Sequence, residues 1–208
     1  MGKKSPLTSA LLLAAALCAA SPAAAVGNDR PKWNITTAAG FPNFFTAQVA
    51  RQVGDKFFLG LSGGAAAGLP EKREACGALV SMAASNVEVV SRYHFTGAAF
   101  FGGFNLGYQD FSVNSKQNTV PGAEYDITDG VKVYYATPHI GWLKAYGSGF
   151  TLGFELGLRL PLSTSRYTER SGPGDYDPSV RKTVNDGMDL LAKKPMPFLT
   201  LIRLGYSF

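Results

Sequence analysis

The chain has 208 residues and a formal net charge of +5 at pH 7, with 24 glycines and frequent aromatic residues. This length suits one domain, and so small a charge excess does not indicate nucleic-acid binding. Apart from the first 25 residues, no apolar run approaches the about 20 residues of a transmembrane helix.

The N-terminal segment has the features of an export signal. Lys3 and Lys4 precede the apolar run Ala10–Ala20, which is followed by Ala23–Ala25. A basic start, a short apolar stretch and small residues before a cleavage point predict a secretory signal peptide over residues 1–25. The mature domain would then span residues 26–208, with its formal charge reduced to +3 because two lysines and no acids are removed.

The two cysteines add little to this picture. Cys18 lies in the signal segment, and Leu17 stands before it where a lipidation motif needs a small residue, so we expect no acylation. Cleavage would leave Cys76 as the single cysteine, which excludes an internal disulfide.

Alternation with a period of two recurs along the mature chain. It is clearest over Thr151–Ser163, where every second residue from Leu152 to Leu162 is leucine or phenylalanine and the other face carries Glu155 and Arg159. Such alternation predicts a strand with one apolar face. The mixed faces are rich in glycine and poor in charge, which suits a narrow barrel interior better than a solvated surface.

These patterns predict eight strands. They lie at Trp33–Gly40, Phe44–Val53, Phe57–Ala66, Val87–Phe95, Ala99–Ser112, Val131–Ala145, Phe150–Ser163 and Pro197–Phe208. The segment Gly40–Asn43 has two interpretations, a turn between the first two strands or a kink within one longer strand.

The predicted connections alternate in length. Short links lie at residues 54–56, 96–98 and 147–149, and longer polar stretches lie at 69–85, 114–130 and 167–194. Short turns at one end and long loops at the other are the layout of outer-membrane barrels. Both termini fall on the short-turn side, which corresponds to the periplasm.

The C-terminal segment Phe198–Phe208 has its own signature. Counting back in steps of two from the last residue gives a mostly apolar face of Phe208, Tyr206, Leu204, Ile202, Thr200 and Phe198. The opposite face carries Arg203. We therefore predict a final strand with aromatic side chains near its end.

The signal peptide, the eight alternating segments and the terminal aromatic residue resemble the small outer-membrane barrel family that includes OmpA and OmpX. This resemblance covers nearly all of the mature chain and implies an all-β fold, an eight-stranded antiparallel transmembrane up-and-down β-barrel. It also implies that Tyr206 and Phe208 form the signal read by the barrel-assembly machinery. The implied partners are outer-membrane lipids, that machinery with periplasmic chaperones, and an extracellular ligand that the sequence does not identify.

A barrel with its apolar faces toward lipid turns its charged residues inward. Unpaired charges in a narrow interior are costly, so acid–base pairing is expected. We predict a salt-bridged network that closes the interior, with a selective pore or a proton path as the alternative. Its predicted members are Glu88, Arg92, His94, His139, Glu155, Arg159 and Arg203.

Few residues suggest chemistry. His94 and His139 are the two histidines and could act as bases or metal ligands, but no third ligand falls beside them. Gly60–Gly64 matches the G-x-S-x-G nucleophile motif, yet it lies in a predicted strand with no helix after it. Four loop acids, Asp126, Asp129, Asp175 and Asp177, lack calcium-loop spacing. We therefore predict no catalytic, cofactor or metal site.

The last long loop contains a helical pattern. Val180, Val184, Met188 and Leu191 recur at near-helical spacing, and Pro195 ends the segment. We expect a short amphipathic helix that covers the extracellular end of the barrel. A helix resting on the lipid surface and an ordinary loop helix are the alternatives.

The sequence thus predicts a non-enzymatic barrel with an envelope structural role or a role in binding through its loops. A lipid-modifying barrel enzyme and a small-solute channel are alternatives within the same fold. A soluble carrier of lipocalin type is a third, in which Leu152–Leu162 would face inward and line the ligand pocket.

Overall fold

The computed structural model describes residues 33–54, 56–66, 70–71, 78–95, 99–120, 123–171 and 178–208. The predicted signal peptide over residues 1–25 lies outside the described residues. The same holds for Cys76, for the predicted short turn at 96–98 and for Asp175 and Asp177.

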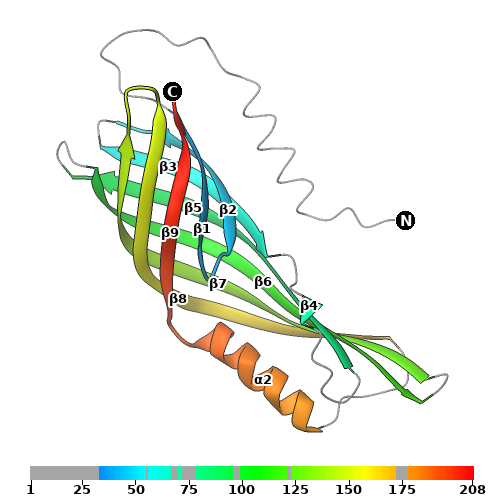
Figure 1. Cartoon of the computed structure of the whole chain (residues 1–208). Coiled ribbons are helices and arrows are strands. Elements are labelled where there is room, and N and C mark those ends of the chain that lie inside the picture. The colour runs from blue at the N-terminus through cyan, green and yellow to red at the C-terminus, as the bar shows by residue number, and fades with distance from the viewer. Residues whose placement is uncertain are drawn as a thin grey trace, which may run out of the picture.

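The described residues form an antiparallel sheet that closes on itself (Figure 1). Its hydrogen-bonded order is β3-β2-β1-β9-β8-β7-β6-β5, and a β3–β5 pairing closes the ring. The short β4 pairs with β5 on the same edge, beyond the end of β3, so eight strands form the ring. The strands are β1 (Trp33–Phe41), β2 (Phe45–Gln52), β3 (Phe57–Ala66), β4 (Pro70–Glu71), β5 (Ala78–His94), β6 (Phe100–Val120), β7 (Ala123–Ala145), β8 (Phe150–Ser171) and β9 (Met196–Ser207), and one helix, α2 (Pro178–Lys193), precedes β9.

The apolar strand faces point out of the ring. Phe154 and Leu156 are about half exposed, at 49% and 52%, whereas Glu155 between them is 1% exposed. Because eight strands enclose an interior that side chains can fill, one face of each strand is buried there and the other meets the surroundings. A lipocalin-type carrier would need the reverse orientation, with the leucines inside, so that alternative is wrong.

Strands β5 to β8 are much longer than the sequence predicts. They contain 17 to 23 residues, whereas β1, β2, β3 and β9 contain 8 to 12. A membrane-spanning strand needs about 9–11 residues. The long strands therefore project past the ring at the end opposite the C-terminus, as Figure 1 shows for β6 and β7.

The polar stretch at 114–130 is accordingly a hairpin and not a loop. The β6–β7 register continues without interruption from Phe100↔Trp142 to Asn118↔Glu124. Val113, Ile127 and Val131 are buried on the inner face of this extension, while polar residues such as Ser115 lie among them. Polar residues interrupt the alternation in this part of the sequence, but the β6–β7 ladder still pairs the backbone along the hairpin.

The first turn falls between β1 and β2. Phe41 ends β1, Phe45 begins β2, and the amide of Gly40 donates to the carbonyl of Phe44 at 3.2 Å. The segment is therefore a tight hairpin turn, and the alternative of one long kinked strand is wrong. The turn carries Asn43, whose side chain is buried inside the barrel.

The final strand does not keep one apolar face over its whole length. Its pairing with β8 shifts between Gly153↔Arg203 and Glu155↔Thr200, which is a β-bulge. A bulge inserts one extra residue and reverses the alternation beyond it. Phe198 and Thr200 therefore face inward, and the prediction that they share a face with Tyr206 and Phe208 is wrong.

Candidate functional site

The charged residues of the interior come from three strands. β5 supplies Glu88 and Arg92, and β8 supplies Glu155 and Arg159, each pair four residues apart. Even spacing in a strand places both members on the same face. Arg203 of β9 completes a set of five side chains that are between 1% and 4% exposed.

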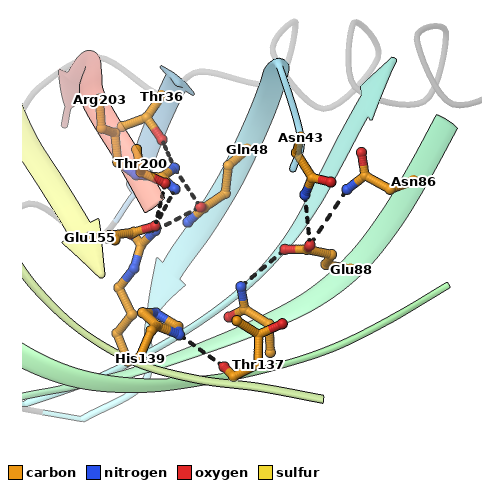
Figure 2. Close-up of polar contacts among 12 residues, drawn as sticks. Thr36, Asn43, Gln48, Asn86, Glu88, Thr137, His139, Glu155, Thr200 and Arg203 are labelled. Atoms are coloured by element: carbon orange, nitrogen blue, oxygen red, sulfur yellow. Dashed lines mark hydrogen bonds and ion pairs between the residues drawn. The ribbon is translucent and has the colours of Figure 1, made fainter. Parts of the chain in front are cut away.

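One half of this network is built around Glu155. Its two carboxylate oxygens accept hydrogen bonds from Arg92 and Arg203, each at 2.7 Å. Both arginines also donate to Oε1 of Gln48 at 2.7 Å, and the Thr200 hydroxyl donates to Glu155 at 3.2 Å. Figure 2 shows Arg203 and Thr200 of β9 at this carboxylate, with Gln48 of β2 beside the arginine. Glu155 thus separates two arginines that would otherwise repel each other.

The other half is built around Glu88. Its carboxylate accepts hydrogen bonds from Arg159 at 3.0 Å, from the Tyr135 hydroxyl at 2.6 Å and from Asn43 and Asn105 at 3.0 Å each. Figure 2 shows Asn43 and Asn86 directed at it. So many donors around one carboxylate compensate for its removal from water.

Arg159 is held on three sides. Its guanidinium donates to Oδ1 of Asn43 at 3.1 Å and to the Gln109 side chain, and it lies 3.8 Å from the centroid of the Tyr135 ring. Three arginines and two glutamates leave this network with one excess positive charge. That excess falls on the half where Arg92 and Arg203 share Glu155.

The two histidines have different surroundings. His139 is 5% exposed, its Nδ1 lies 3.0 Å from the Thr137 carbonyl oxygen, and its ring lies near Phe101 and Phe198. His94 is half-buried, with its ring near Phe58 and Phe101. Both therefore pack against aromatic rings of the barrel.

The weaker chemical motifs have structural positions. Ser62, the central residue of the G-x-S-x-G match, is buried within β3, so the strand-to-helix turn that this nucleophile motif requires is not formed there. Among the residues that the structure describes, no group of three or more histidine, cysteine or acidic side chains could hold a metal ion.

Sequence reasoning missed the neutral members of the network. Gln48, Gln109 and Tyr135 lie on the inward faces of their strands and could have been found by extending the alternation to polar residues. Asn43 lies in a turn, where alternation carries no information. Thr200 lies beyond the bulge, where the alternation counted back from Phe208 places it on the wrong face.

Helix α2 covers the interior next to Glu88, on the side away from the C-terminus. Met188 and Ala192 are buried against Val113, Val131, Val133 and Tyr135 on the inner face of β6 and β7. Arg166 of β8 forms an ion pair with Asp189 of the helix, and Lys193 approaches the same carboxylate at 2.9 Å. The helix predicted from Val184 and Met188 is thus present and packs into the concave side of the projecting sheet.

A small cavity lies next to the network in the barrel interior. A cavity bounded by Asn43, Ser62, Glu88, Thr200 and Arg203 has a volume of about 10 Å³. That is room for roughly one water molecule. The charged layer and the helix follow one another along the barrel, joined through Tyr135.

The outer surface carries the signs of a membrane belt. Along β7, the outward side chains from Tyr134 to Trp142 are uncharged, and Lys132 and Lys144 lie beyond the two ends of this run. The run has the length of a transmembrane strand, and aromatic residues at its ends match the interfacial girdles of membrane barrels. No helix in the described part of the chain is long and apolar enough to cross a bilayer.

A closed antiparallel ring with an apolar outer belt and a polar, charged interior defines the integral outer-membrane β-barrel. Among solved structures, this chain is similar to a major outer membrane protein from Thermus thermophilus, with a TM-score of 0.56 and 17% identity over 85% of this chain and 98% of that one. It is also similar to CarO and CarO2 from Acinetobacter baumannii, with TM-scores of 0.47 and 0.46, identities of 12% and 11%, and coverage of 86% and 87% of this chain and 98% and 100% of theirs. No family model and no curated protein matches the sequence.

Proposed function

We propose that this protein is a non-enzymatic, non-conducting barrel of a Gram-negative outer membrane. The observation that carries this proposal is the pairing of Glu88 with Arg159 and of Glu155 with Arg92 and Arg203 in the barrel interior. A porin-type barrel needs a continuous aqueous channel, which eight strands are too few to leave once inward side chains fill the space. The charged layer serves as a plug that fixes the strands relative to one another.

The projecting sheet and helix α2 are the part that serves the envelope or binds an extracellular ligand. β6, β7 and β8 continue about ten residues beyond the length that a bilayer requires, which supports a role outside the membrane. The proposal includes export by the signal peptide over residues 1–25, periplasmic termini, and folding with periplasmic chaperones and the barrel-assembly machinery.

Conductance in planar bilayers tests the plug. Purified, folded protein is expected to give no steady openings in 1 M KCl, while a porin in the same bilayers verifies that insertion and detection work. Steady large openings of the wild-type protein would refute the non-conducting function and favour a small-solute channel.

Lipid mass spectrometry tests the absence of lipid-modifying activity. His139 packs between aromatic rings and contacts a backbone carbonyl, a setting that supports a structural role. Outer-membrane lipids are expected to be identical in cells that express wild type, the His139→Ala variant or no protein. A lipid species present with wild type and lost with His139→Ala would instead favour the enzyme.

A further inference from the structure

The membrane-facing wall of the barrel contains an apolar groove outside the charge network. It has a volume of about 760 Å³, within the range of roughly 300–1,000 Å³ typical of ligand sites. Exposed side chains of β3, β5, β6, β7 and β8 form its walls, among them Tyr93, Phe104, Ile140 and Leu156.

The groove arises from a gap in one row of cross-strand neighbours. The registers place Phe57, Tyr93, Gly102, Ile140 and Leu156 side by side on five successive strands. Four of these residues are large and apolar, and the fifth is a glycine. The missing side chain at Gly102 leaves a depression between Tyr93 and Ile140.

The neighbouring row keeps the depression open. There, Ser91, Phe104 and Pro138 are cross-strand neighbours, so two small side chains flank one aromatic ring. The Ser91 hydroxyl already donates to the Phe104 carbonyl at 2.6 Å. The groove therefore offers hydrocarbon contact and no free hydroxyl from this serine, which suits an apolar chain and not a polar solute.

The groove lies within the apolar, membrane-facing belt of the barrel. Pro138 and Ile140 lie within the uncharged outward run of β7, so the groove opens into the hydrocarbon region of the bilayer. On the same face, Trp142 and Lys144 follow Ile140 toward the end of the barrel where the C-terminus lies. Lys144 is about 13 Å along the strand from Ile140, at the level expected for lipid headgroups.

We propose that this groove is a specific site for a phospholipid of the leaflet on the side of the C-terminus, with one acyl chain lying against Gly102 and the phosphate near Lys144. The site is continuous with the lipid-facing belt, and its walls are formed mainly by apolar side chains. It does not depend on whether the interior conducts or on any role of the projecting sheet.

Retention of lipid by the folded protein tests this site. Wild type and variants are reconstituted in dioleoyl phosphatidylglycerol vesicles, extracted into mild detergent, washed, and examined by native mass spectrometry. Gly102→Leu fills the floor of the groove, where an added Cβ would be 3.4 Å from Phe95. The matched control is Gly63→Leu, an outward glycine of β3 with similar free space and no part in the groove.

Wild type and Gly63→Leu are expected to retain one phospholipid, and Gly102→Leu to retain at least ten times less. Lys144→Gln is expected to weaken retention severalfold. Heat-modifiable migration verifies folding, and Gly102→Val replaces the leucine variant if that variant does not fold. Equal retention by wild type and the Gly102 variants would overturn the proposal. Two further results would also overturn it. One is that protein extracted from native membranes retains lipopolysaccharide in place of phospholipid. The other is that cross-linking of the wild type in membranes gives a dimer that Gly102→Leu abolishes.

Discussion

Tyr135 donates a hydrogen bond from its hydroxyl to Oε1 of Glu88 at 2.6 Å, and its ring packs in the apolar cluster beneath helix α2. The same ring supports the Arg159 guanidinium, 3.8 Å from its centroid. Tyr135 therefore belongs both to the charged layer and to the neighbouring apolar cluster that helix α2 covers. A change at this residue affects both layers, whereas a change at its outward neighbour Tyr134 affects neither.

Replacing Tyr135 by phenylalanine tests this link. The ring and its contact with Arg159 are kept, but Glu88 loses one donor in a site closed to water. Hydrogen bonds to charged groups contribute about 2 kcal/mol, so the free energy of unfolding should fall by that amount. Urea unfolding in lipid vesicles measures it. Tyr134→Phe is the control, since that side chain is 57% exposed, and equal losses in the two variants would contradict the role of Tyr135.

Glu155 should matter more than any surface carboxylate. Glu155→Gln leaves Arg92 and Arg203 buried beside each other without an anion between them. Removing one partner of a buried ion pair costs about 3–5 kcal/mol, and the same urea titration should detect a loss of that size. Glu169→Gln on the exposed part of the same strand should change stability by less than about 0.5 kcal/mol. A Glu155→Gln variant as stable as Glu169→Gln would mean that the network does not hold the barrel together.

Periodicity predicted the presence of eight strands and the inward direction of Glu88, Arg92, Glu155, Arg159 and Arg203, because each of these follows from local alternation. It did not predict that Thr200 and Arg203, three residues apart, both point inward. That arrangement requires the bulge in β9, which local sequence does not encode and which depends on pairing with β8. The network partner Asn43 was also out of reach, since a turn residue has no face until the hairpin is placed over the interior.

The prediction of the strand lengths was wrong for a related reason. Between Ser112 and Gly130, most residues are polar, so the sequence shows no clear apolar alternation and resembles a loop. The hairpin there is held by its β6–β7 ladder and by the helix that covers Val113 and Val131, both of which are contacts between segments distant in sequence. A sequence pattern read one segment at a time does not contain such contacts.

Docking of helix α2 should depend on acid pH through Asp189. Its hydrogen bond with Lys193, together with Arg166, lowers the pKa of the Asp189 carboxyl. Lys193 lies on the helix itself, so only the pairing of Asp189 with Arg166 of β8 links this carboxyl to docking. That pairing stabilises docking above the ordinary carboxyl pKa of about 3.9 and is lost as the pH falls from there through the lowered pKa. Helix docking is therefore expected to be constant from neutral pH down to about 4 and to weaken in stronger acid.

A spin label on the helix measures this dependence. Gly187 has no atom near the position of an added Cβ, so Gly187→Cys in a Cys76→Ser background provides a site for the label. Its mobility should rise below about pH 4 in this protein. When Asp189→Asn is added, the label should have at every pH the high mobility that the unsubstituted protein shows only in acid. Equal pH profiles with and without Asp189→Asn would show that other groups control docking.

Phe208 should act in assembly more than in the stability of the finished barrel. Its backbone amide and carbonyl pair with Trp33 at 2.9 and 2.8 Å, and neither bond needs the side chain. The ring itself is 40% exposed on the outer face, near Tyr206. Phe208→Ser therefore leaves the closing strand pair intact and removes the aromatic group that the assembly machinery is expected to recognise.

Two measurements separate assembly from stability. The heat-modifiable fraction in cells should fall severalfold for Phe208→Ser, while the refolded variant should unfold within about 1 kcal/mol of wild type. Leu204→Ser is the matched control, because Leu204 is outward on the same strand and 39% exposed. Its cellular level should fall little, since the apolar surface lost is similar but the terminal residue is unchanged. Equal reduction of both variants in cells would show that apolar surface, and not a C-terminal signal, limits assembly.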